Sequence, residues 1–255
     1  MIHTEQLGSV TVLRMQHGKV NALDAELLER LSTELEQVER SPARALVLTG
    51  GGRSFSAGVD LWRVLDGGEP YLKRFVPLLR QTLTQLFAFP RPVVAAINGH
   101  AIAGGCVLAC ACDYRIMAAG TARLGVPELH VGVPFPSIAF EIVTSVAPTG
   151  LLSRLIYLGE LFDPQEAEQS RLVDEIVAAD ELLARACEVA DHLAAIPPET
   201  YRVTKRQLRE PALERAARNA KTVDNEVERI WGSEAVTAAI RAYMEKTVRK
   251  RPPAS

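Results

Sequence analysis

The stretch Ile97–Leu108 carries residue types that suit chemistry, because an apolar strand runs through a glycine-rich turn directly into a helix. Backbone N–H groups at a helix start lack intrahelical partners and carry partial positive charge, which suits a ligand oxyanion. Gly104 and Gly105 have no Cβ atom, so a ligand can come close to this backbone. The stretch therefore predicts an oxyanion hole, while a turn that only lets strand and helix pack closely stays open.

A phosphate-binding P-loop is the first competing interpretation of these glycines. In a P-loop, Lys and then Ser or Thr follow the last glycine of the motif. Gly104 is instead followed by Gly105 and Cys106, so the sequence disfavours this kind of phosphate site.

A second apolar strand runs into glycines within residues 44–61, and with it the chain resembles a known family, the crotonase or enoyl-CoA hydratase/isomerase superfamily. The resemblance runs nearly end to end. It rests on five motifs in family order: Lys19–Leu23 (KVNAL), Phe55–Leu61 (FSAGVDL), Ile97–Cys106 (INGHAIAGGC), Cys112–Ile116 (CDYRI) and Val126–Gly132 (VPELHVG).

Strands alternate with helices along the chain, which predicts an α/β fold with a covered sheet. Strands are expected at residues 9–15, 45–49, 93–97, 114–117 and 172–177, and helices at 24–40, 71–88, 103–112, 137–146, 151–157 and from 199 to 249. The resemblance implies the crotonase arrangement, a spiral of repeated ββα units followed by a helical C-terminal region. We expect a core domain over 1–196 and a helical region over 197–255, divided at Ile196-Pro197-Pro198.

Bulk composition is ordinary for a soluble globular protein: 255 residues, 47% hydrophobic, 24% charged, formal net charge −2. It gives no signal for nucleic acid. No apolar stretch reaches the length of a bilayer span and no signal core follows the N-terminus, so we expect a cytoplasmic protein without a membrane partner. Cys106, Cys110 and Cys112 lie among small apolar residues with no second Cys or His pair at zinc spacing, so no metal is expected.

The C-terminal part is basic, with 13 Lys or Arg against 7 Asp or Glu from Tyr201 onward. Such a region can meet the phosphates of a nucleotide-bearing substrate, or can simply form the solvated face of helices. An apolar stripe through Val223, Val227, Ile230, Trp231 and Val236, together with the resemblance, predicts self-association as a homotrimer or a dimer of trimers.

The resemblance implies an acyl-CoA substrate and no further cofactor. Backbone N–H groups of Val59 and Gly104 would hold the thioester oxygen. Residues that would surround the CoA, mostly through backbone atoms, are Lys19, Asn21, Ala22, Leu23, Ser56, Ala57, Asp60, Leu61 and Trp62. Lys19, Lys246 or Lys250 would face the CoA phosphates, and residues 62–75 and 135–140 would form the wall around the acyl chain.

Family hydratases hold and deprotonate a water with two glutamates, and the resemblance places these positions at Val107 and Glu128. A valine can neither accept a proton nor orient water. Glu128 lies among apolar residues, and desolvation there raises the pKa of a carboxyl group toward that of a useful general base. His130 would share a face with Glu128 if the local backbone were extended, and could then serve as a second acid or base in the substrate site.

One base and an oxyanion hole suffice to move a double bond. The chain therefore most resembles the Δ3,Δ2-enoyl-CoA isomerases of fatty acid β-oxidation, with Glu128 as the base. An enoyl-CoA hydratase or another crotonase activity that recruits His130 or Trp62 stays open, as does a non-catalytic acyl-CoA-binding protein. A thioesterase acting through Ser54 or Ser56 is disfavoured, because no nucleophile-elbow motif frames either serine.

Overall fold

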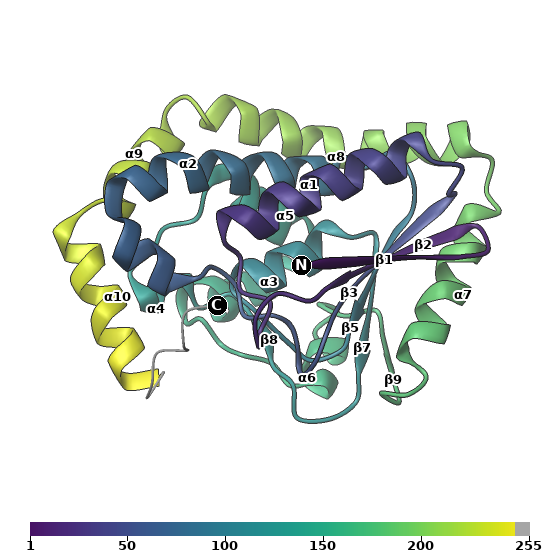
Figure 1. Ribbon diagram of the computed structural model, residues 1–255, viewed down its shortest axis with the longest axis horizontal. Helices are drawn as coiled ribbons and strands as arrows, with labels where there is room; N and C mark the ends of the chain where they lie inside the picture. The colour runs from purple at the N-terminus through teal and green to yellow at the C-terminus, as the bar shows by residue number, and fades with distance from the viewer. Residues whose placement is uncertain (248–255) are drawn as a thin grey trace.

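The computed structural model describes residues 1–247, whose strands form a large and a small sheet (Figure 1). The large sheet runs in the order β1 (Ile2–Leu7), β2 (Val10–Met15), β3 (Ala45–Gly50), β5 (Val93–Ile97), β7 (Tyr114–Ala118) and β9 (Glu175–Val177). Its first two strands pair antiparallel, and its other neighbours pair parallel. The small sheet is parallel and runs in the order β4 (Ser54–Ser56), β6 (His100–Ile102) and β8 (Leu124–Gly125).

A strand of the large sheet, a strand of the small sheet and a helix follow one another three times along the chain. The three units are β3-β4-α2 (α2, Leu61–Phe87), β5-β6-α3 (α3, Gly104–Ala111) and β7-β8-α4 (α4, Glu128–Val131). This order confirms the predicted α/β spiral of ββα units. Because β4, β6 and β8 lie side by side, the segments that leave these strands toward the three helices also lie close together.

Alternate residues of the large sheet enter two separate apolar cores, as expected for strands buried on both faces. In β5, Val94 and Ala96 pack on the side of α7 (Leu182–Ala194), whereas Val93, Ala95 and Ile97 face the larger core. Helix α1 (Ala25–Arg40) contributes its leucines to the larger core and begins at Asp24, whose carboxylate accepts the N–H of Leu27.

Several expected boundaries are wrong. Helix α2 begins at Leu61 rather than at residue 71, because Asp60 caps it by accepting the N–H groups of Trp62 and Arg63. The helix has one break at Gly68, whose φ is 54°. The strand expected over 172–177 is confined to β9. In place of the helix expected over 151–157, the chain forms a 3₁₀ helix (Thr149–Leu151) and a π-helix (Ser153–Tyr157). Strand β1 was not expected.

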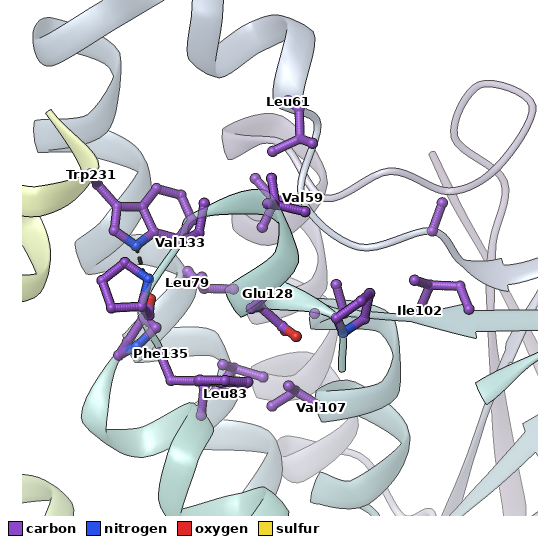
Figure 2. A pocket seen from close by; sticks show the side chains of 18 of the residues that line it. Val59, Leu61, Leu79, Leu83, Ile102, Val107, Glu128, Val133, Phe135 and Trp231 are labelled. Carbon is purple, nitrogen blue, oxygen red and sulfur yellow. Dashed lines mark hydrogen bonds between the residues drawn. The ribbon is translucent and has the colours of Figure 1, made fainter. Parts of the chain in front are cut away.

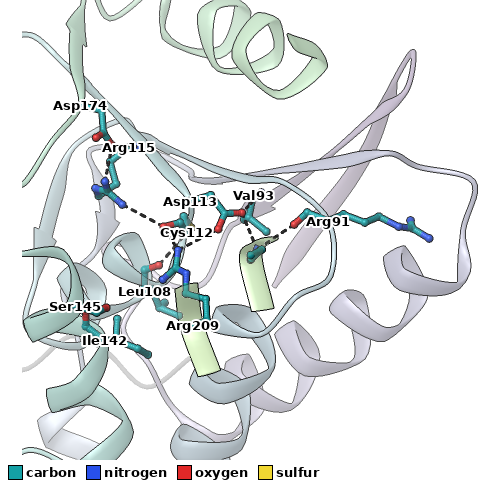
Figure 3. Close-up of polar contacts among 11 residues, drawn as sticks. Arg91, Val93, Leu108, Cys112, Asp113, Arg115, Ile142, Ser145, Asp174 and Arg209 are labelled. Carbon is teal, nitrogen blue, oxygen red and sulfur yellow. Dashed lines mark hydrogen bonds and ion pairs between the residues drawn. The ribbon is translucent and has the colours of Figure 1, made fainter. Parts of the chain in front are cut away.

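The helical pattern expected from residue 199 onward consists of three helices within the described residues. They are α8 (Pro198–Asn219), α9 (Val223–Trp231) and α10 (Glu234–Thr247). Helix α8 docks on the spiral through Asp113, whose carboxylate contacts Lys205 Nζ at 2.6 Å. The same carboxylate contacts Arg209 Nη2 at 3.0 Å (Figure 3). Burial lowers the pKa of Lys205, and the neighbouring Asp113 carboxylate opposes this effect. A domain division at residue 196 stays a prediction.

Two further helices, α5 (Ser137–Val146) and α6 (Pro164–Gln169), pack against the spiral. Among residues 1–247, no single helix has both the length and the apolar character of a membrane span. Helix α5 and the following 149–157 segment meet that criterion only as a pair, across a bend of 116°.

Candidate active site

The turn after β4 places the N–H of Val59. Gly58 has a φ of +82°, which an L-residue rarely adopts, and a Cβ atom there would lie 2.7 Å from the carbonyl oxygen of Ile102. Backbone hydrogen bonds fix the turn on both sides of Val59, since Leu23 N–H donates to Gly58 O (2.8 Å) and Asp60 N–H donates to Leu23 O (2.9 Å). The turn is therefore held by the KVNAL segment, Lys19–Leu23.

The turn after β6 places the N–H of Gly104 at the first position of α3, where a helix offers no internal acceptor. Ala103 before it has a φ of 51°, an uncommon backbone conformation for a residue with a side chain. Gly105 lies so close to the carbonyl group of Ser56 that no Cβ atom could fit. In the described residues, the N–H groups of Val59 and Gly104 donate to no protein acceptor, so both are available to a ligand oxygen.

Asn21 stabilises the turn that follows β4. Its side chain is buried and its Nδ2 donates to the carbonyl groups of Ser54 and Phe55, at 2.9 and 3.2 Å. The hydroxyl of Ser56 donates to Asn21 O at 2.7 Å and accepts the N–H of Gly58 at 3.2 Å. Asn21 and Ser56 thus position the Gly58–Val59 turn, a structural role that the resemblance alone did not assign to them.

Glu128 is the first residue of α4, in the third ββα unit. The residue as a whole keeps some exposure, but its Oε2 atom is buried and has no hydrogen-bond partner in the described part of the chain. Removal of the carboxylate from water raises the pKa of Glu128 to about 8, against a smaller lowering effect of its own backbone N–H. A carboxyl group with this pKa can take up and release a proton near neutral pH.

Val59, Gly104 and Glu128 line one pocket, which encloses about 700 Å³ of empty space, part of it open to solvent. Figure 2 shows Glu128 pointing into this space, with Val107 and Val59 around it. The rest of the lining is almost wholly apolar. Of the described lining residues, only Glu128 and Tyr243 have ionisable side chains, so Glu128 supplies the pocket's one carboxyl group in this part of the chain.

The structure places the expected CoA-binding residues in different surroundings. Ala57 and Leu61 line the pocket directly. Leu23 is buried beneath the first turn and Ala22 is half-buried beside it, while Asp60 caps α2 and the half-buried Trp62 packs against the core. Lys19 and Lys246 are exposed, and Lys250 lies outside the described residues. These placements leave the CoA-binding roles as predictions.

The condition under which His130 would share a face with Glu128, an extended local backbone, is not met. Residues 128–131 form a helical turn rather than extended backbone, so residues two apart point in different directions. The ring Nε2 of His130 lies 2.7 Å from the carbonyl oxygen of Leu158, and His130 is absent from the described pocket lining. His130 therefore fixes α4 to the 153–158 segment and does not face the substrate pocket.

The pocket wall differs in part from the expected one. Phe135, Pro136 and Ala139 contribute to it as predicted, but α2 contributes Leu61, Leu79 and Leu83 rather than residues 62–75. Trp231 and Tyr243 complete the wall from α9 and α10. Sequence reasoning placed Trp231 only in an apolar stripe for self-association, because helical spacing shows that a face is buried without showing what it faces.

No group of three or more His, Cys, Asp or Glu side chains is arranged to hold a metal ion within residues 1–247. Cys106, Cys110 and Cys112 are buried and unpaired by disulfides. Burial raises the pKa of Cys112 to about 12, so this thiol stays protonated and unreactive at neutral pH.

Comparison with known proteins identifies the family of the chain. Residues 5–251 match the sequence profile of the enoyl-CoA hydratase/isomerase family. The chain is 27% identical over 254 residues to mitochondrial enoyl-CoA delta isomerase 1 of Mus musculus, covering 98% of this chain and 88% of the relative. It is 30% identical over 207 residues to short-chain-enoyl-CoA hydratase of Clostridium acetobutylicum, covering 80% and 79%. The structure of human mitochondrial delta3-delta2-enoyl-CoA isomerase is similar at a TM-score of 0.90 and 26% identity, covering 98% and 99%.

Proposed function

The chain belongs to the enoyl-CoA hydratase/isomerase family of acyl-CoA enzymes, and we propose that it moves the double bond of a 3-enoyl-CoA to the 2-position. The observation that supports this choice is the content of the pocket. Glu128 is its one carboxyl group among the described lining residues, and Val107, which the family resemblance matches to the second glutamate of the hydratases, lines the same pocket.

In the proposed reaction, the thioester oxygen accepts hydrogen bonds from the N–H groups of Val59 and Gly104. The Glu128 carboxylate removes a proton from C2, and the electron pair of that C–H bond spreads over the dienolate and its oxygen. The Glu128 carboxylic acid then returns the proton to C4, while the remaining double bond forms between C2 and C3. No water or cofactor enters this balance.

The residues supply the energetics of this reaction in two ways. Each preorganised N–H donor that faces the developing oxyanion is worth roughly 2.7–4 kcal/mol of barrier lowering. A positioned base contributes on the order of 10²–10⁴-fold in rate. The described lining offers no second carboxylate that could hold a water beside Glu128, which favours return of the proton to carbon over addition of water.

Hydration of a 2-enoyl-CoA is the second candidate, because the relatives with comparable identity include an enzyme named as a hydratase. Parallel assays with 3-enoyl-CoA and 2-enoyl-CoA substrates separate the two activities. We expect isomerase turnover to exceed hydratase turnover by a wide margin. Strong hydratase activity without isomerase activity would reject the proposal, and binding of acyl-CoA without either reaction would indicate a carrier protein.

A further inference from the structure

Trp231 and Phe135 lie on one side of Glu128 in the pocket, and Ile102 lies on the other side (Figure 2). The Ile102 side adjoins the oxyanion turns, because a Cβ atom on Gly58 would nearly touch the Ile102 carbonyl oxygen. This side also adjoins the KVNAL segment, since Ala57 N–H donates to Val20 O at 3.0 Å. If the CoA enters along this segment, the acyl chain runs past Glu128 toward Trp231.

The indole of Trp231 is held in place by several contacts. Its Nε1–H donates to the carbonyl oxygen of Pro134 at 2.9 Å, and its ring lies 6.3 Å from that of Phe75 between ring centroids. Only 3% of Trp231 is exposed. The hydrogen bond satisfies the one polar atom of the side chain, so the ring forms a fixed apolar wall.

An ion pair between the buried Asp224 and the half-buried Arg80 fixes the helix that carries Trp231. Asp224 in α9 is 1% exposed, and its carboxylate accepts the N–H of Ser137 at 2.7 Å and contacts Arg80 Nε at 3.1 Å. Arg80 also contacts Glu228 of α9 at 3.1 Å. These bonds link α9 to α2 and to the start of α5, the two helices that supply Leu79, Leu83 and Ala139 to the same pocket.

We propose that Trp231 closes the acyl end of the pocket and sets an upper limit on the length of the acyl chain. This inference rests on the proposed function, because it takes the pocket to hold the acyl group of a CoA thioester. Each buried methylene tightens binding about fourfold until the chain reaches the indole. Longer straight chains then gain nothing further or clash, so the preferred substrates are enoyl-CoAs whose acyl chain ends before Trp231.

The test compares the unaltered protein with Trp231→Leu in two assays. Titration calorimetry with a graded series of saturated straight-chain acyl-CoAs measures affinity without any reaction, and kcat/KM with 3-enoyl-CoAs of matching lengths measures turnover. We expect the affinity of the unaltered protein to rise with acyl-chain length up to a certain length and then to stop rising, which gives a break in the length profile. In Trp231→Leu the break moves to longer chains, and affinity for chains beyond the original break rises about tenfold or more.

Tyr157→Ala is the control, because Tyr157 is an exposed aromatic residue outside the described pocket lining. Its length profile should match that of the unaltered protein. An unmoved break in a folded Trp231→Leu protein overturns the inference about Trp231. A moved break in a protein that isomerises no 3-enoyl-CoA upholds the role of Trp231 and rejects the proposed isomerase function.

A fluorescence measurement covers the case in which substitution of Trp231 prevents folding. The chain has two tryptophans, so Trp62→Phe leaves Trp231 as the only indole. Its emission should change once the bound saturated acyl-CoA is long enough to reach the ring, and should be constant for shorter chains. Emission that does not depend on chain length would overturn the inference.

Discussion

A Cβ atom on Gly58 would lie 3.1 Å from the backbone nitrogen of Gly104, so the turns that precede α2 and α3 are in direct contact. A Cβ atom on Gly104 would in turn lie 3.7 Å from Gly58 Cα and 3.9 Å from Val59 Cγ2. Two segments distant in sequence thus present their free N–H groups to one pocket. The spacing of these groups depends on the absence of a side chain at Gly58.

We therefore predict that Gly58→Ala lowers kcat/KM by on the order of 10²-fold, the usual loss when one oxyanion donor is displaced. The substitution also strains the backbone, because the φ of Gly58 is +82°. Gly52→Ala is a matched control, since Gly52 has a φ of +70° and no atom within 4 Å of its Cβ position. Steady-state kinetics and thermal melts of both variants check the prediction, which fails if the two lose activity equally.

Glu128→Gln should lower isomerase turnover by on the order of 10²–10⁴-fold while acyl-CoA affinity changes little. Glutamine keeps the size of the side chain but has no basic oxygen that could take a proton from C2. Glu69→Gln, at an exposed glutamate of α2, serves as the control for the loss of a carboxylate. Near-normal turnover in folded Glu128→Gln would exclude Glu128 as the base.

The pH dependence of the unaltered protein should report the raised pKa of Glu128, about 8. The reaction needs the carboxylate, so kcat/KM should fall about tenfold for each pH unit below 8 and level off above it. A profile that is flat between pH 6 and 9 would contradict this assignment. The profile of Glu128→Gln should lack the fall in kcat/KM below pH 8.

The same pKa has a consequence for stability. The folded-state pKa of Glu128 lies above its value of 4.5 in the unfolded chain, so the folded state binds the proton more tightly. Stability is therefore greatest below about pH 4.5 for this group and is lost as pH rises through 8, by up to a few kcal/mol. Denaturant unfolding should show that Glu128→Gln gains stability relative to the unaltered protein between pH 5 and 9.

The glycine motifs were predictable from the sequence because each is a short local pattern, whereas the ββα spiral and the place of Glu128 were expected from the family resemblance. The role of His130 was not predictable, since it depends on whether residues 128–131 are helical or extended, and Pro127 allows both. The pocket wall was predictable only in part. Leu79 and Trp231 become neighbours of one pocket through the packing of α9 against α2, which no local pattern encodes.

We predict that the protein sediments as an oligomer, most simply a trimer, at micromolar concentration. The apolar stripe that first suggested this association is used mainly within the chain, since Val227, Trp231 and Val236 are buried in its own core. The prediction therefore rests on the family resemblance. Sedimentation velocity decides it, and a single species at the monomer mass would contradict it.

Val107→Glu should give the protein measurable hydration of 2-enoyl-CoA. Val107 lies on α3, one turn after Gly104, and lines the same pocket as Glu128, so a carboxylate there would join Glu128 in holding a water. Val107→Gln is the control, because it adds similar polar bulk without a base. Hydration by the Glu variant alone supports the account. If a folded Val107→Glu protein binds acyl-CoA but hydrates no 2-enoyl-CoA, the lack of a carboxylate at position 107 is not the reason why the protein has low hydratase activity.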